Sequence, residues 1–237
     1  MNVQSTDIIG QLVAENYQYA SIFKKYDIDF CCQGNRTIGE ACDKKELDTE
    51  KVVSSLNAVN KEQTLGEPDF DSWDLDLLAD YIQKKHHRYV ENKIPEIQPY
   101  LDKICRVHGG RHPELHQINQ LFQETAGELT MHMKKEELML FPQIRKMVSQ
   151  KGEGVKGNMK AMVDEMMHEH LNEGERFHEI MELSNNYTPP ADACNTYAVT
   201  FALLKEFEED LHRHIHLENN ILFPKSIMIA EELLEIN

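Results

Sequence analysis

Two stretches of the chain repeat one spacing of residues that can ligate a metal. Both read His-x-x-x-Glu-x-x-x-Leu-Phe-Pro, one starting at His132 and the other at His214. Residues four apart lie on the same face of a helix, so His132 shares a face with Glu136. In the second copy Glu218 shares a face with His214. A single pair of this kind is usually a solvated surface pair, but its recurrence indicates that the two copies serve one metal centre.

Both copies continue the core-facing stripe of a helix. Residues recur at steps of three and four before each histidine: Leu204, Phe207 and Leu211 before His214, and Leu121, Thr125 and Leu129 before His132. Such a stripe faces the interior of a helical bundle. Because an isolated buried charge is very costly, a buried histidine and glutamate require a partner. A bound metal satisfies both.

Nearly the whole chain has the pattern of helices. β-Branched runs are few, and there is no Asn-Gly or Asp-Gly hairpin turn. Turn signals at Gly109-Gly110, Lys151–Gly154 and Pro189-Pro190 divide the region from residue 73 into four segments of similar length. Segments joined by short turns pack as antiparallel neighbours, which predicts an all-α fold with an up-down-up-down four-helix bundle. Pro95 and Pro99 are expected to kink the first segment or break it into two pieces.

One histidine from each of these four segments can lie at the same level of the bundle. In an antiparallel pair, residues at equal height are equally far from the turn between them. His87 and His132 lie symmetrically about the first turn, and His132 and His170 about the second. His170 and His214 straddle the third turn in the same way. The spacing therefore predicts four imidazoles beside two carboxylates.

Periodicity leaves two of these choices open. His86 follows the stripe of its helix somewhat better than His87 does. His168 lies within one turn of the required height, as His170 does. The helical repeat alone decides neither.

The donor set favours two metal ions over one. Six ligands are too many for one zinc ion, which usually has four and often includes cysteine. Two ions that share Glu136 and Glu218 as bridges would each receive two imidazoles, with room for an oxo or hydroxo bridge. Iron or manganese suits such nitrogen and oxygen ligands.

The N-terminal region is expected to be a small helical domain. One helix is predicted to begin at a cap near Ser5–Asp7 and to include Phe23. Thr37 and Glu40 form the pattern of a capping box, which begins a new helix. That helix is expected to run to about Asn60.

A linker is predicted to follow this domain. Residues 61–72 contain turn formers and no apolar period, and Ser72 can cap a helix that starts near Trp73. The expected organisation is a helical domain over residues 1–60, this linker, and the bundle over residues 73–237.

Composition excludes several classes of protein. All twelve histidines of the 237 residues lie between His86 and His216, so their enrichment belongs to one region. With 41 acidic residues against 25 basic ones the formal charge is −16, which argues against a nucleic-acid or anionic-membrane partner. No apolar run approaches the ~18–20 residues of a membrane span, and the first residues lack a signal-peptide pattern. Five cysteines, with Cys31 beside Cys32, are an odd number, so the cytoplasm is the expected location.

The sequence resembles the repair-of-iron-centres family over almost its whole length. Asp29-Phe-Cys-Cys-Gln-Gly34 is similar to the signature of the family's N-terminal domain, and His-Leu-Glu-Asn-Asn at 216–220 is similar to the end of its hemerythrin-like domain. The resemblance implies a hemerythrin-like bundle with a non-haem di-iron centre, which repairs iron–sulfur clusters damaged by oxidative or nitrosative stress. Its implied partners are damaged iron–sulfur proteins and nitric oxide or oxygen. A homodimer is compatible with the residues, which do not require one.

The resemblance also implies a ligand set. The family's six ligands fall on His87, His132, Glu136, His170, His214 and Glu218. His87 is favoured over His86 because it stands eight residues before Pro95, as in relatives, and His170 over His168 on similar grounds. An oxygen-carrying hemerythrin has a further histidine where this chain has Gly174, which argues against simple oxygen carriage.

Other residues receive weaker expectations. Cys31 and Cys32 are interpreted as cofactor-binding thiols that contact a cluster, nitric oxide or another chain, with structural burial as the alternative. Cys42, Cys105 and Cys194 are expected to be ordinary small buried residues. Glu128 and Glu169 are interpreted as partners of the ligands or steps of an iron exit path, with a solvated helix face as the alternative. No catalytic residue is assigned.

Two rival functions remain at this stage. One is a di-iron sensor that binds oxygen or nitric oxide, and the other is an oxidoreductase that reduces nitric oxide. A repair protein would lose iron to an acceptor, a sensor would bind gas reversibly, and an enzyme would turn over with an electron donor.

Overall fold

The computed structural model describes residues 2–59, 68–149 and 159–236. Most of the predicted linker (residues 61–67) and the predicted turn at Lys151–Gly154 lie outside the described residues. Within them the chain forms helices, with one isolated antiparallel bridge between Ile8 and Thr37 and no β-strand. The prediction of an all-α fold is confirmed.

Packing divides the chain into two units. One comprises Met1–Leu78 together with Ile215–Asn237, and the other comprises Ala79–His214. The boundaries expected from composition, at residues 60 and 73, stay a prediction.

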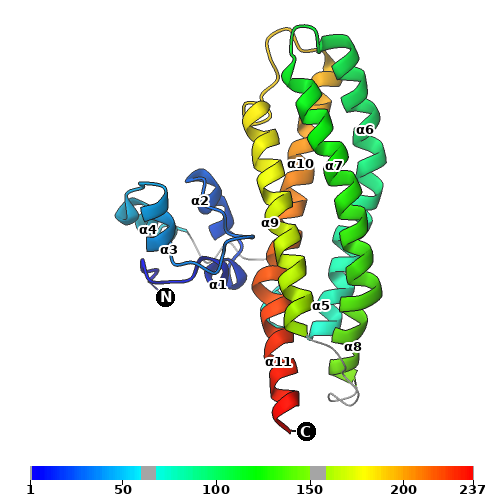
Figure 1. The fold of residues 1–237 in the computed structure, drawn as a ribbon. Helices are drawn as coiled ribbons and strands as arrows, with labels where there is room; N and C mark the ends of the chain where they lie inside the picture. Colours follow the sequence, from blue (N-terminus) through cyan, green and yellow to red (C-terminus); the bar gives the residue numbers. More distant parts are fainter. Residues whose placement is uncertain (1, 60–67, 150–158, 237) are drawn as a thin grey trace. The chain divides into compact units, whose positions relative to one another are not determined.

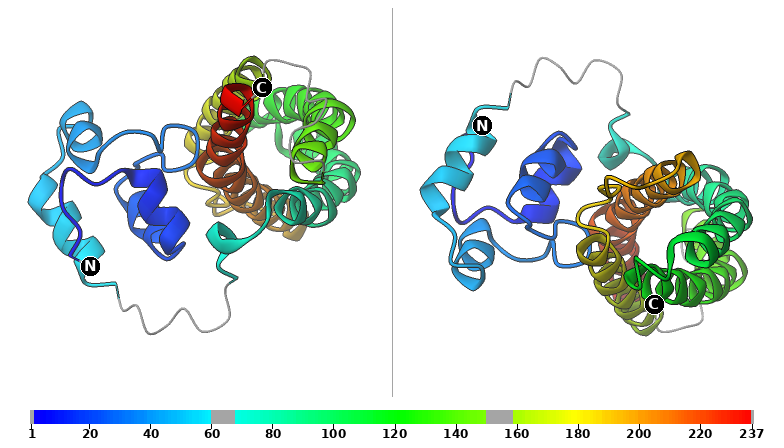
Figure 2. Two further views of the ribbon diagram at one scale, coloured as in Figure 1. Left: turned by 90° about the horizontal axis from the view of Figure 1, so that it is seen from below. Right: turned by 90° about the horizontal axis from the view of Figure 1, so that it is seen from above.

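The second unit contains the bundle. Four long helices lie side by side and alternate in direction (Figures 1 and 2): α6 (Arg88–His108), α7 (Glu114–Lys135), α9 (Met159–Leu183) and α10 (Asn195–Leu217, of which the residues up to His214 belong to this unit). α8 (Phe141–Ser149) continues the direction of α7 after a single wider turn. The predicted up-down-up-down arrangement is confirmed.

Aromatic rings fill the middle of this bundle. Phe207 of α10 packs against Phe122 of α7 at 5.4 Å between ring centroids and against Phe177 of α9 at 5.5 Å. All three side chains are fully buried. Burial of each ring stabilises the fold by about 1.5–3 kcal/mol, so this layer holds α7, α9 and α10 in register. Along α7, Phe122 lies between the start of the helix and the predicted ligand His132.

Three one-turn π-helices interrupt the α-helices at the predicted ligands. They are η3 (Gln83–His87), η4 (Glu136–Leu140) and η5 (Glu218–Leu222). π-Turns inside α-helices occur frequently at functional sites. Here every one of them contains or begins at a predicted metal ligand.

The Leu-Phe-Pro ending of each repeat overlaps one of these turns. Leu140 is the last residue of η4, and Pro142, two residues later, has no N–H to donate. The Phe141 N–H donates to the Glu136 carbonyl five residues back. Phe223 and Glu218 repeat this bond in η5.

Several predicted helix boundaries in the bundle were wrong. Pro95 and Pro99 lie inside α6, which runs unbroken, and the interruption occurs upstream in η3. The helix expected from Trp73 begins at Leu75 as α5 (Leu75–Ile82), while Phe70–Ser72 forms a 3-10 turn.

The N-terminal helices are shorter than predicted. The helix expected up to Phe23 is two, α1 (Ile9–Glu15) and α2 (Tyr19–Lys25), and Ile8 precedes α1 without a side-chain cap. The capping box of Thr37 and Glu40 is confirmed at the start of α3 (Ile38–Lys44). α3 ends before Glu46, whose left-handed φ of 54° closes the helix, and α4 (Thr49–Asn57) begins anew from an Asp48 cap.

Within the first unit, the loop that contains Cys31 and Cys32 is hydrogen-bonded to η5. The side-chain amide of Asn219 donates to the Cys31 carbonyl, and that of Asn220 donates to the Phe30 carbonyl, each at 3.1 Å. The Gly10 N–H donates to the Gly34 carbonyl at 2.7 Å, and a Cβ on Gly10 would lie 2.2 Å from Asn220 Oδ1. A side chain at position 10 would therefore force the Asn220 side chain to move from its present place.

Candidate metal centre

The six predicted ligands are all removed from solvent. Their exposed fractions are 0% for His87, Glu136 and Glu218, 1% for His170 and His214, and 3% for His132. Carboxylates this deeply buried are unfavourable unless they are paired or bind a cation.

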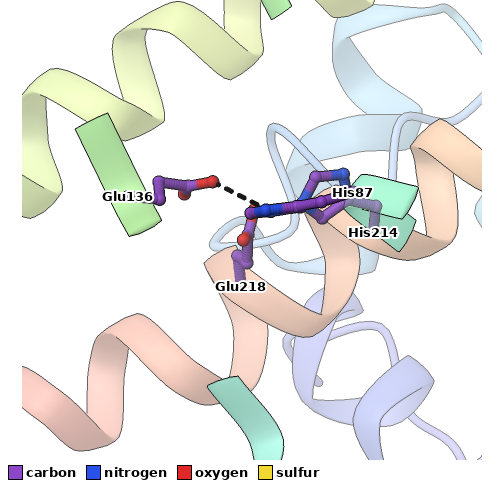
Figure 3. A group of neighbouring side chains, drawn as sticks. All are labelled: His87, Glu136, His214 and Glu218. Carbon is purple, nitrogen blue, oxygen red and sulfur yellow. Dashed lines mark ion pairs between the residues drawn. The ribbon is translucent and has the colours of Figure 1, made fainter. Parts of the chain in front are cut away.

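These six residues form two overlapping groups that could each hold a metal ion. The groups are His87, Glu136, His214 and Glu218, and His132, Glu136, His170 and Glu218, and within each the ligand atoms lie within 4.8 Å of one another. Figure 3 shows the first group, with its side chains turned toward a common point. Glu218 follows His214 by one turn of the same helical run, so local geometry sets its place relative to that histidine. Each group contributes two imidazoles, and both groups contain the same two carboxylates.

Glu136 lies between two histidines. Its Oε2 is 3.3 Å from His87 Nε2, the contact dashed in Figure 3, and its Oε1 is 3.4 Å from His132 Nε2. Each carboxylate oxygen thus faces a different imidazole. That orientation allows one carboxylate to ligate two ions.

Two histidines converge on one point of the second group. The Nε2 atoms of His132 and His170 are 2.9 Å apart. Two imidazoles bound to one metal at ~2.0–2.1 Å bring their nitrogens to about 3 Å from each other. The spacing of these nitrogens fits two ligands of one ion.

Carboxylates hold the outer nitrogens of two of the histidines. His87 Nδ1 lies 2.9 Å from Glu137 Oε1, and His132 Nδ1 lies 2.8 Å from Glu169 Oε2. Such a bond places the proton on Nδ1 and directs the Nε2 lone pair inward, as metal-binding histidines require.

Glu169 is suited to this task electrostatically. The hydrogen bond with His132, aided by Lys135, lowers the pKa of the Glu169 carboxyl from 4.5 to about 2. It is therefore ionised at neutral pH and accepts a hydrogen bond from the His132 Nδ1–H. Of the three expectations for Glu169, its position supports a partner of the ligands.

The structure distinguishes the two neighbouring histidines on η3. Both are buried, but His87 joins the first ligand group, whereas His86 is absent from both groups. His86 Nδ1 lies 3.0 Å from Asp210 Oδ1, and its ring stacks on His214 at 5.6 Å between centroids. His86 therefore supports the orientation of His214.

The alternative on α9 differs in exposure. His168 is exposed, whereas His170 is buried.

Two further glutamates pair with Arg176. Glu128 is exposed and lies 3.1 Å from Arg176, which fits the interpretation that it belongs to a solvated helix face. Sequence reasoning missed Glu173, which is 3% exposed, lies one turn after His170 and pairs with Arg176. Burial raises the pKa of the Glu173 carboxyl.

Alanine at His170 and alanine at His168 should have opposite outcomes. His170→Ala removes one of the two imidazoles of the second group, so we expect about one iron ion fewer per chain. His168→Ala removes only an exposed side chain of the same helix and should leave the iron content unchanged. Iron analysis of the two purified variants checks this, and equal loss in both would refute the choice of His170.

The cysteine pair forms a separate small group. Cys31 and Cys32 are buried free thiols with their sulfurs 3.7 Å apart, and Asp29 Oδ1 accepts both of their backbone N–H groups. The hydrogen bond to Cys32, together with burial, raises the pKa of the Cys31 thiol well above its usual range. Ligand atoms of these three residues lie within 4.8 Å of one another, so they too could hold a cation.

Comparison with known proteins agrees with this geometry. Residues 78–226 match the family described as "Hemerythrin HHE cation binding domain", and residues 5–60 match ScdA_N, described as "Domain of Unknown function (DUF542)". The "Iron-sulfur cluster repair protein ScdA" of Staphylococcus haemolyticus is 32% identical over 94% of this chain and 99% of its own length. The chain belongs to the ScdA/YtfE family.

Further members of the ScdA/YtfE family show the same relation. The "Iron-sulfur cluster repair protein YtfE" of Escherichia coli (strain UMN026) is 33% identical over 92% of this chain and 96% of its own length. YtfE of Musicola paradisiaca is 32% identical over 92% of this chain and 95% of its own length. The resemblance read from the motifs is thereby confirmed. Among the described residues of this ScdA/YtfE member, no helix has the length and hydropathy to cross a membrane.

Proposed function

We propose that this protein binds two iron ions through the six buried ligands and repairs iron–sulfur clusters damaged by oxidative or nitrosative stress. The observation that carries the proposal is the pair of ligand groups that share Glu136 and Glu218. The relatives named iron-sulfur cluster repair proteins support the repair role. When bound, the iron pair supplies exchangeable iron and a redox-active centre.

The chain's own residues prepare the site for two ions. The two oxygens of Glu136 face His87 and His132 separately, which favours a bridging carboxylate. Glu137 and Glu169 keep the Nδ1 protons in place, so the inner nitrogens are available without rearrangement. Gly174 offers no further imidazole one turn after His170, so the ligand set leaves room for an exogenous molecule.

The cysteine pair has a proposed part in the same function. Cys31 and Cys32 act as cofactor-contacting thiols, which receive iron or nitric oxide. Their adjacent sulfurs, together with Asp29, support this role. Their loop is bonded through Asn219 to η5, the turn that begins with Glu218. All five cysteines are free thiols, which supports a reducing compartment such as the cytoplasm.

Repair is tested by restoration of a damaged enzyme. The iron-loaded protein is incubated with an iron–sulfur enzyme inactivated by nitric oxide, in the presence of sulfide and a thiol. We expect recovery of enzyme activity, with loss of iron from the protein to the acceptor in step. Protein in which Glu136 and Glu218 are both leucine should give no recovery above buffer.

Other outcomes would replace the proposal. Reversible binding of nitric oxide or oxygen without iron loss or recovery identifies a sensor. Many turnovers of nitric oxide with an electron donor identify an oxidoreductase. If Cys31→Ser with Cys32→Ser repairs as well as the wild type and as well as Cys42→Ser, the proposed role of the cysteine pair is refuted.

A further inference from the structure

An exposed cysteine and a buried histidine meet where α10 begins. Cys194, the residue before α10, places its Sγ 3.2 Å from Nε2 of His108, the last residue of α6. His108 is only 5% exposed, whereas Cys194 is exposed. The expectation of a buried Cys194 was wrong. His108 lies 21 residues after His87 along the helical run, or roughly 30 Å, so this pair is remote from the metal ligands.

The imidazole of His108 makes its polar contact with the Cys194 thiol. Its other nitrogen, Nδ1, is buried and makes no hydrogen bond with any described residue. The ring packs edge-on against the buried ring of Tyr197, with 5.4 Å between centroids. Its position is therefore fixed by packing, with the thiol as the one polar contact of its side chain in the described part of the chain.

The start of α10 adds further donors. The backbone N–H groups of Tyr197 and Thr196 contribute to a lowered pKa of Cys194, and the positive end of the helix dipole also favours a thiolate there. The Tyr197 N–H and His108 are the leading causes that lower the pKa of Cys194 to about 7.

Asp192, two residues before Cys194, is paired with a cation. Asp192 lies 3.0 Å from Arg111 Nη1 and also 3.0 Å from His112 Nε2, and Glu114 lies 3.2 Å from His112 Nδ1. The Asp192 carboxylate therefore opposes a thiolate less than an isolated carboxylate would.

The other cysteines lack these features. Cys31, Cys32, Cys42 and Cys105 are buried. Burial raises the pKa of the Cys105 thiol to about 11 and also raises that of Cys42. Cys194 is thus the accessible thiol of the chain.

We propose that Cys194 is a site of reversible thiol–disulfide exchange with small disulfides, positioned and activated by His108. The Cys194 thiolate attacks one sulfur of the small disulfide and forms a protein mixed disulfide. The S–S bond of the small molecule breaks, and its second sulfur leaves as a thiolate with the bonding electrons. The small disulfide is the oxidant, so the step needs no other reactant. Exchange is fastest for an attacking thiol whose pKa is near the ambient pH.

Oxidised glutathione serves as the probe for this site. The full-length, iron-loaded protein is incubated with it at pH 7, and the product is analysed by intact mass and peptide mapping. We expect one glutathionyl group, located on Cys194 and removed by a reducing thiol. Cys194→Ser should take up none, whereas Cys105→Ser, which removes a buried thiol, should be labelled as the wild type is. Labelling at another cysteine, or none in the wild type, would overturn the proposal.

The pH dependence of alkylation tests the role of His108. In the wild type, the rate for Cys194 should rise with a midpoint near pH 7. His108→Asn should move this midpoint toward the value of about 8.5 of a free cysteine and slow the reaction at pH 7 about threefold. His112→Asn, which alters only the neighbouring histidine, should keep the wild-type midpoint. A wild-type midpoint of 8.5 or above would refute the activation of the thiol, even if His108→Asn failed to fold.

Discussion

Replacement of Glu136 and Glu218 together by leucine should reduce bound iron from two ions per chain to less than one. Both carboxylates belong to both ligand groups, so the double substitution removes two of four protein ligands from each ion. Only a pair of imidazoles would remain for each. Iron analysis, with a spectroscopic test for a coupled pair, measures the loss.

The same double variant should still fold. Both carboxylates are fully buried, and exchange of buried charges for apolar groups of similar size is often neutral or stabilising. Circular dichroism should therefore show wild-type helicity. Glu128→Leu is the matched control, because Glu128 lies one turn before His132 but is exposed. If the double variant retains two ions per chain, the bridging role of the glutamates is wrong.

The second large effect is expected at Glu169, which touches a ligand rather than the metal. Glu169→Gln should weaken iron binding by 10- to 100-fold, as is typical when the partner of a metal-binding histidine is lost. A glutamine can turn its amide N–H toward His132 Nδ1. That orientation would place the imidazole proton on Nε2, the atom that must bind the metal. Competition with a chelator of known affinity measures the change.

Glu165→Gln separates this effect from general charge loss. Lys135 pairs with both Glu165 and Glu169, but only Glu169 reaches His132. Glu165→Gln should therefore bind iron like the wild type. Equal weakening in the two variants would show that the lysine pairing, and not the bond to His132, is responsible.

The pH dependence of the metal-free protein gives an independent readout of Glu169. Its folded-state pKa, about 2, lies below the ordinary 4.5, so its stabilising contribution is complete above pH 4.5. That contribution disappears as the pH falls from 4.5 toward 2. Urea unfolding should show this decline in the wild type and a shallower one in Glu169→Gln. Identical slopes would contradict the bond to His132.

Sequence periodicity predicted the bundle because His132 and His214 lie on stripes that their helices must bury. The repeat at His132 and His214 also contained more than a ligand pair, since in both copies the glutamate begins a π-turn, η4 or η5, that ends at the leucine of Leu-Phe-Pro. The breaks between α1 and α2 and between α3 and α4 were not predicted. Short N-terminal helices depend on single caps and left-handed residues such as Glu46, which compete closely with helix continuation.

The sequence by itself determined which helices carry the ligands and at what level of the bundle they meet. Helical spacing fixes height to within a turn, but it does not decide between His168 and His170. Packing makes these two histidines differ, since His170 is buried and His168 is exposed. Only the tertiary structure brings Glu169 to His132, 37 residues away, and Cys194 to His108, 86 residues away. Such contacts depend on the rotation of each helix about its axis and on which helices are neighbours. Helix rotation and helix neighbours are both set by the packing of the whole core, so they cannot be predicted from a local pattern of residues.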